Sequence, residues 1–115
     1  MKGTRMEVTI TARHFKAHAT LRDYAEDALK KLEKYYDHIV TAEVILSYEK
    51  AANSLKSAEV LVSVHGALLK GIDKSDDFPK SIDIAVAKVE RQLVKYKAKQ
   101  REKKKTTIRE KQAKV

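Results

Sequence analysis

The 115-residue sequence contains no cysteine and no tryptophan, one proline and three glycines. Without cysteine it forms neither a disulfide nor a thiolate metal site. Its scattered glycines make no glycine-rich loop, which excludes the P-loop and the dinucleotide-binding fingerprint. No apolar run approaches the roughly 20 residues that cross a bilayer, and the N-terminus lacks the apolar stretch of a signal peptide. We therefore expect a cytoplasmic protein with one modest core and no membrane partner.

Residue groups for catalysis are also scarce. His14 and His18 have the i, i+4 spacing of a metal pair on a helix, but no third ligand stands at a suitable distance. His38 and His65 are isolated, and no order or spacing suggests a Ser/His/Asp triad. We therefore expect no enzyme activity, no metal, no cofactor and no small-molecule substrate.

Charge is abundant and unevenly distributed. The net charge is +9, from 25 Lys and Arg against 16 Asp and Glu. Residues 1–77 hold 12 basic and 12 acidic side chains, whereas residues 78–115 hold 13 basic and only 4 acidic ones. All of the excess lies in the last third of the chain. This asymmetry points to a polyanionic partner, either nucleic acid or an anionic membrane.

The first half of the chain reads as a strand, a helix and a second strand. Apolar and polar residues alternate over Met6–Arg13, as in a half-buried strand. A helix is predicted over Thr20–Tyr36, where apolar residues recur every three or four positions. Thr20 with Asp23 matches a capping box, and His18 with Ala19 opening the helix is the competing start. Val40–Tyr48 alternates again, followed by a polar loop over Glu49–Lys56.

The second half reads as a hairpin and a helix. Strands are predicted over Ser57–His65 and Leu68–Asp73, joined by a tight turn at Gly66. An acidic pair before Phe78 marks a helix start, and the apolar stripe of that helix ends near Lys99. Residues 100–115 lack an apolar period and are predicted to be a flexible, solvated basic tail, helical at most near its start.

The element order is therefore β-α-β-β-β-α. The helical crossover makes the first two strands parallel, and short connections make the other pairs antiparallel. This predicts an α+β two-layer sandwich, in which two helices cover one face of a mixed four-stranded sheet. Residues 1–99 form this domain and residues 100–115 the tail.

The strongest functional signal is a line of cations on the last helix. Lys88, Arg91, Lys95 and Lys99 are spaced by three or four residues and lie along one side of it. The first helix adds Arg22, Lys30, Lys31 and Lys34. If the helices pack side by side, the two groups can border one positive groove that follows a phosphate backbone. A solvated helix face is the alternative interpretation.

Two other binding modes fit less well. Base stacking on a sheet needs paired aromatics on an outward strand face, and Tyr48 is the only strand aromatic. A membrane-surface protein needs an exposed apolar helix face, whereas both apolar stripes are needed for the core. Recognition of RNA by backbone charge and shape remains.

Three segments resemble the ribosome hibernation promoting factors and ribosome-associated inhibitor A proteins, also called sigma-54 modulation proteins. The segments are Leu32-Glu-Lys-Tyr-Tyr36, Asp76-Asp77-Phe78 and Lys88-Val-Glu-Arg-Gln-Leu-Val-Lys-Tyr96. The match runs from about Met6 to Lys99 in register with the expected element order.

The resemblance implies binding to the small ribosomal subunit, in the channel of mRNA and the A- and P-site tRNAs. Occupying this channel blocks translation and preserves idle ribosomes in stationary phase or stress. The implied 16S rRNA contacts are Arg22, Lys31, Lys34, Lys88, Arg91, Gln92, Lys95 and Lys99. We expect the free protein to be a monomer. It is either a short-type factor or the N-terminal domain of a longer one, and a general double-stranded RNA-binding module is the alternative function.

Overall fold

The structure is a computed structural model that describes residues 6–36, 38–49 and 55–113, with side chains up to Lys99. Four strands, two α-helices and one 3-10 turn follow the predicted order. They are β1 (Glu7–Arg13), α1 (Ala19–Lys30), η1 (Lys31–Lys34), β2 (Ile39–Glu49), β3 (Leu55–Val64), β4 (Ala67–Ser75) and α2 (Phe78–Ala113). Residues 50–54 of the predicted polar loop lie outside the described residues.

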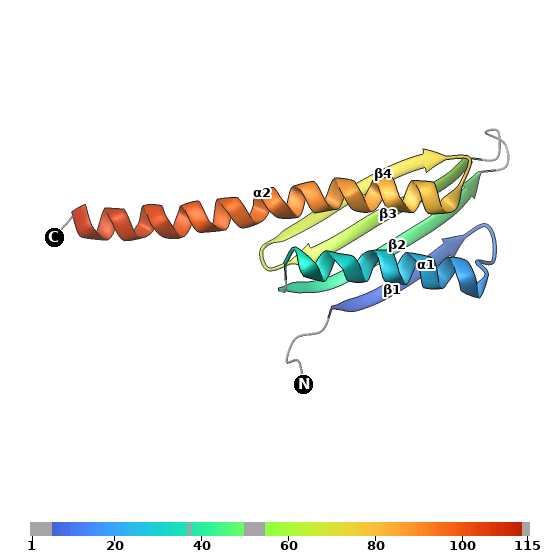
Figure 1. Cartoon of the computed structure of the whole chain (residues 1–115), viewed down its shortest axis with the longest axis horizontal. Coiled ribbons are helices and arrows are strands. Elements are labelled where there is room, and N and C mark those ends of the chain that lie inside the picture. Colours follow the sequence, from blue (N-terminus) through green and yellow to red (C-terminus); the bar gives the residue numbers. More distant parts are fainter. Residues whose placement is uncertain (1–5, 37, 50–54, 114–115) are drawn as a thin grey trace.

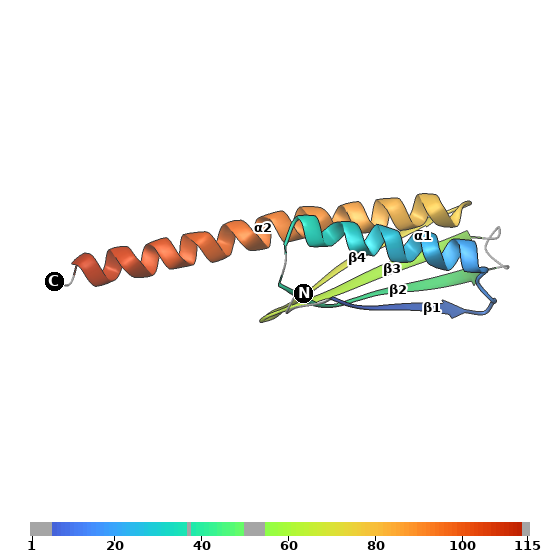
Figure 2. The ribbon, with the colours of Figure 1, turned by 60° about the horizontal axis from the view of Figure 1, so that its bottom comes forward.

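The strands form one sheet in the order β1-β2-β3-β4. β1 pairs parallel with β2, while β2 with β3 and β3 with β4 pair antiparallel. α1 and α2 run side by side over the same face of this sheet (Figures 1 and 2). The predicted α+β sandwich with a mixed four-stranded sheet is therefore confirmed. β1 and β4 are its two edge strands.

The core lies between the helices and the sheet, as the alternating patterns predict. Every second residue is buried over Ala42–Leu46 of β2 and Ala58–Val64 of β3, while the residues between them face the open side of the sheet. Apolar burial of this kind is the main favourable term in folding. The fully buried aliphatic side chains with the largest volumes are Leu29, Leu32, Val44, Leu46, Val60, Val62, Ile82, Val89 and Leu93.

The first helix differs from the prediction at both ends. Its N-cap is His18 and its first residue is Ala19, so the competing start is correct and the Thr20 capping box is wrong. Thr20 lies inside the helix because Ala19, a strong helix former, extends it by one residue. At the other end the α-helix stops at Lys30, and η1 replaces the predicted last turn. Such 3-10 turns commonly finish a helix.

The second helix starts as predicted and ends later. The side chain of Asp77 accepts a hydrogen bond of 3.1 Å from the amide of Lys80, an N-cap just before Phe78. The helix then continues to Ala113, so the expectation of helix only to about Lys99 is wrong. Residues 100–113 contain no glycine or proline and are rich in Lys, Arg, Glu and Gln, which favour helix. The division into a domain over 1–99 and a tail over 100–115 stays a prediction.

Candidate nucleic-acid interface

α2 lies against β4 at a distance that only glycine permits. Gly71 of β4 is buried under the helix, and a Cβ there would overlap the carbonyl oxygen of Ala85. The same Cβ would lie 3.1 Å from the Cβ of Lys88. The close approach of helix and strand brings the Lys88 side of α2 to the exposed edge of the sheet.

Three side chains of α2 hydrogen-bond to backbone at this edge. The ammonium group of Lys88 donates to the carbonyl of Ile72 (2.7 Å). Gln92 both accepts from the amide of Lys70 (3.2 Å) and donates to its carbonyl (2.6 Å). The hydroxyl of Tyr96 donates to the carbonyl of His65, in the turn between β3 and β4. We call Lys88, Gln92 and Tyr96 the edge ladder.

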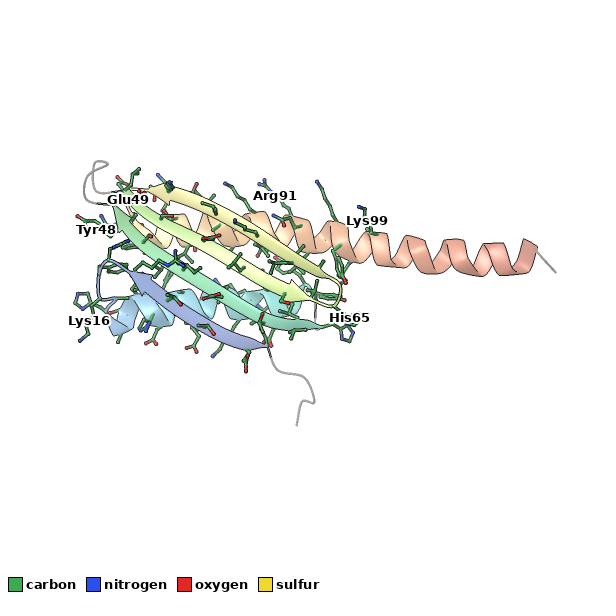
Figure 3. The ribbon with its side chains drawn as sticks, turned by 180° about the vertical axis from the view of Figure 1, so that it is seen from behind. Lys16, Tyr48, Glu49, His65, Arg91 and Lys99 are labelled. Atoms are coloured by element: carbon green, nitrogen blue, oxygen red, sulfur yellow. The ribbon has the colours of Figure 1, made fainter. Side chains whose placement is uncertain are left out.

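A second row of α2 lies beside the edge ladder and points to solvent. It consists of Arg91, Lys95 and Lys99, which are all exposed and spaced by four residues. Their side chains make no hydrogen bond or ion pair with another residue in the described part of the chain. Figure 3 shows Arg91 and Lys99 on the β4 side of the helix. We call these three residues the outer basic row.

Arg22 lies at the opposite edge of the molecule. Its guanidinium donates to the carbonyl of Ile10 on β1 (3.3 Å). Together with Ile10, Asp23 and Glu26 it lines a shallow hollow between α1 and β1. The two carboxylates offset the charge of Arg22 and reduce its attraction for a polyanion.

Lys31 and Lys34 lie in η1, at the end of the first helix. Both side chains are exposed, and neither side chain makes a hydrogen bond or ion pair with another described residue. Their position at the C-terminal end of a helix also suits the helix dipole. α1 and α2 run in the same direction, and the ring of Tyr36, just after η1, meets the ring of Tyr96 in the middle of α2 (centroids 5.6 Å apart). η1 is therefore level with the Tyr96 turn of α2.

The space between the helices is not a positive groove, which corrects our expectation. The hydroxyl of Tyr24 on α1 donates to the carboxylate of Asp83 on α2, with oxygen distances of 2.7 and 2.8 Å. Glu90, two helical turns beyond Asp83, lies on the same side of α2. The four predicted α2 cations, Lys88, Arg91, Lys95 and Lys99, lie on another side of the helix from Asp83 and Glu90, because α2 turns its Lys88 side to β4. The eight predicted contacts are thus divided among the β1 edge, η1 and the β4 side of α2.

The Tyr24–Asp83 contact also perturbs ionisation. The hydrogen bond to Asp83, partial burial and the negative charge of Asp83 raise the pKa of the Tyr24 phenol above 10.0. The phenol is therefore protonated at neutral pH and joins the two helices.

Sequence reasoning missed Tyr96 as a polar contact. Its ring packs against the core, as expected for an aromatic residue in the apolar stripe of this helix. The available signal was its spacing of four from Gln92 and eight from Lys88, which puts all three on one side of the helix. The sequence did not show that this side meets a strand edge.

Other kinds of site find little support. Among the residues whose side chains are described, no three His, Asp or Glu converge as a metal site would require. The described helices include none with the length and apolar character needed to cross a membrane.

The chain matches known proteins over nearly all of its sheet, over α1 and over the first two thirds of α2. The model of the family described as "Sigma 54 modulation protein / S30EA ribosomal protein" matches residues 8–101. The ribosome hibernation promoting factor of Azotobacter vinelandii is 33% identical over 95 residues, which cover 83% of this chain and 86% of that protein. The ribosome hibernation promotion factor of Bacillus subtilis (strain 168) is 30% identical over 94 residues, covering 82% of this chain and 50% of that protein.

Two solved structures share the fold. The Thermus thermophilus Protein Y N-terminal domain superposes with a TM-score of 0.70 at 29% identity, covering 79% of this chain and 99% of that one. A ribosomal subunit interface protein from Coxiella burnetii gives a TM-score of 0.73 at 28% identity, covering 81% and 99%. The sheet and helices described above are thus a recurrent arrangement.

Proposed function

The chain belongs to the Sigma 54 modulation protein / S30EA ribosomal protein family, and from this premise we propose that it is a ribosome hibernation factor. Relatives from Azotobacter vinelandii and Bacillus subtilis carry that name. The observation that carries the proposal to this chain is the outer basic row, three exposed cations at a regular helical spacing without described partners. A polyanion of regular charge spacing is the partner that such a row fits.

The proposed partner is the small ribosomal subunit, and the proposed ligand is its 16S rRNA. The domain occupies the channel of mRNA and the A- and P-site tRNAs, as the family resemblance implies. The outer basic row together with Lys31 and Lys34 provides five exposed cations on the helix layer. Lysine and arginine side chains that replace condensed counterions gain affinity from the release of those ions.

Inhibition then follows from occupancy alone. A folded domain in the decoding channel excludes mRNA and tRNA sterically, so it stops translation while it is bound and needs no chemical step. We propose that the protein is not an enzyme and acts in the cytoplasm, where ribosomes lie. The general double-stranded RNA-binding module is the competing function.

Co-sedimentation with small subunits tests the proposal. Arg91→Glu with Lys95→Glu should abolish binding at moderate salt, because two attractive contacts become repulsive. The matched control is Arg13→Glu with Lys16→Glu, which changes the net charge equally at exposed positions. Arg13 ends β1, at the sheet edge opposite β4, and Lys16 lies far from the outer basic row (Figure 3). Binding by the first variant at wild-type strength would overturn the proposed site.

A second measurement separates the two candidate functions. The wild-type protein is titrated with a plain RNA duplex and with intact small subunits at one salt concentration. A hibernation factor should bind the subunit far more tightly than the duplex and should stop translation in a cell-free system. Equal affinities, with translation unaffected, would favour the general RNA-binding module.

A further inference from the structure

β4 is an edge strand, and side chains of α2 occupy its outward backbone groups at Lys70 and Ile72. In an antiparallel edge strand every second residue directs its amide and carbonyl away from the sheet. Lys70 and Ile72 are two such residues, since their backbone groups meet α2. Open groups of this kind are a template on which another strand can pair. The edge ladder fills this template in the middle of β4.

Gln92 imitates a neighbouring strand. Its carboxamide offers one N–H and one carbonyl to Lys70, the same pair of groups that a peptide unit in an added strand would offer. Gln92 makes both hydrogen bonds at once, so the amide and the carbonyl of Lys70 are not available to an added strand. Lys88 and Tyr96 extend the contact one helical turn to either side.

The spacing of helix and strand makes the ladder possible. Four helical residues rise about 6 Å. Two strand residues rise about 6.6 Å. Lys88 and Gln92 are four apart and meet Ile72 and Lys70, which are two apart. The two periods match closely enough for side chains of one helix row to follow the strand.

We propose that the edge ladder closes β4 to strand addition and that its members are positioning residues rather than RNA contacts. The α2 residues that contact RNA are then those of the outer basic row. This second part of the proposal, on RNA contact, rests on the proposed function. The closed edge keeps copies of the chain from pairing β4 to β4. When the ladder is removed, the partner that pairs with the open edge of β4 is a second copy of this chain.

The RNA half is tested by the salt dependence of binding to small subunits. Lys95→Met and Lys88→Met each remove one charge from α2 and keep the length of the aliphatic side chain. Each phosphate contact contributes about 0.7 to 0.9 to the slope of log affinity against log salt. Lys95→Met should lower the slope by that amount, whereas Lys88→Met should leave it at the wild-type value. An equal drop in both variants would overturn the division of roles.

The edge half needs no ribosome and is decided separately. Gln92→Leu, and Gln92→Leu with Lys88→Met, remove the ladder bonds in the middle of β4. Amide exchange at Lys70 should become at least tenfold faster, and sedimentation should show mass rising with concentration above that of the wild type. Arg91→Leu, one residue away in the outer basic row, should change neither. Unchanged Lys70 exchange and mass in both ladder variants, with circular dichroism showing an intact fold, would overturn the proposal.

The two halves fail in different ways. If the wild-type protein does not bind small subunits, the proposed function is wrong while the exchange and mass measurements still decide the edge ladder. If the protein binds but Lys88→Met lowers the salt slope, the proposed function stands and Lys88 is an RNA contact.

Discussion

Gly71 of β4 and Ala85 of α2 lie so close that the carbonyl oxygen of Ala85 occupies the space of a Cβ on Gly71. This contact sets the distance between the last helix and the edge strand. With Ala85 facing Gly71, the rotation of the helix is such that Lys88 and Gln92 reach the backbone of β4 while Arg91 and Lys95 do not.

Gly71→Ala should lower the free energy of unfolding by about 1–3 kcal/mol, the usual cost of overpacking a well-packed contact. The helix must move away from β4, which also lengthens the bond from Lys88 to Ile72. Denaturant unfolding measures the change. The control is Gly66→Asn, at a turn with φ of 85° and no atom within 4 Å of a built Cβ. Asn tolerates that conformation, so the control should lose little stability; equal losses in both variants would contradict the explanation.

Charge reversal at η1 and at Arg22 should have different effects on small-subunit binding. Lys34→Glu should weaken binding roughly tenfold, about 1.4 kcal/mol, because Lys34 is exposed and without a described partner. Arg22→Glu should weaken it less, since Arg22 already bonds to Ile10 and lies beside Asp23 and Glu26. Titration of labelled protein with subunits measures both. A larger loss for Arg22→Glu would place RNA at the β1 edge.

The Tyr24–Asp83 contact should make stability depend on pH in the alkaline range. The folded-state pKa of Tyr24 is raised above 10.0, so the folded state holds the phenolic proton more tightly than the unfolded chain does. The resulting stabilisation is fully present below pH 10 and is lost as pH rises through the folded pKa. Tyr24→Phe lacks it.

Denaturant unfolding of wild type and Tyr24→Phe between pH 7 and pH 11 measures this dependence. The difference between the two proteins removes the pH dependence that they share and so reports on Tyr24. The wild-type advantage, about 1 kcal/mol at neutral pH for one hydrogen bond, should shrink above pH 10. An advantage that grew with pH would contradict the assigned cause.

Phe15 should contribute to stability although it lies outside every helix and strand. Its ring stacks on Phe78 at the start of α2, with centroids 4.9 Å apart. Phe15→Ala should cost about 2 kcal/mol, less than for a fully buried ring because Phe15 is half-buried. Phe15→Leu should restore part of the loss by refilling the volume. Thermal unfolding should give the stability order wild type, then Phe15→Leu, then Phe15→Ala. A Phe15→Ala variant as stable as the wild type would show that the stack contributes nothing.

Local patterns in the sequence were sufficient for the fold. Alternation in β2 and β3 identified Val44, Leu46, Val60 and Val62 as buried, because a strand face repeats every two residues. Helix ends were less predictable. The choice between His18 and Thr20 as the cap depends on small differences in local energy.

The sequence by itself determined the element order, the buried faces, the position of the positive charge and the resemblance to a family. It also placed Lys88, Arg91, Lys95 and Lys99 along one side of the last helix. Only the tertiary structure decided which row meets β4 and which meets solvent. The reason is that helical spacing fixes the angles between side chains but not the rotation of the helix on the sheet. That rotation is set by packing between distant residues, here by Ala85 over Gly71.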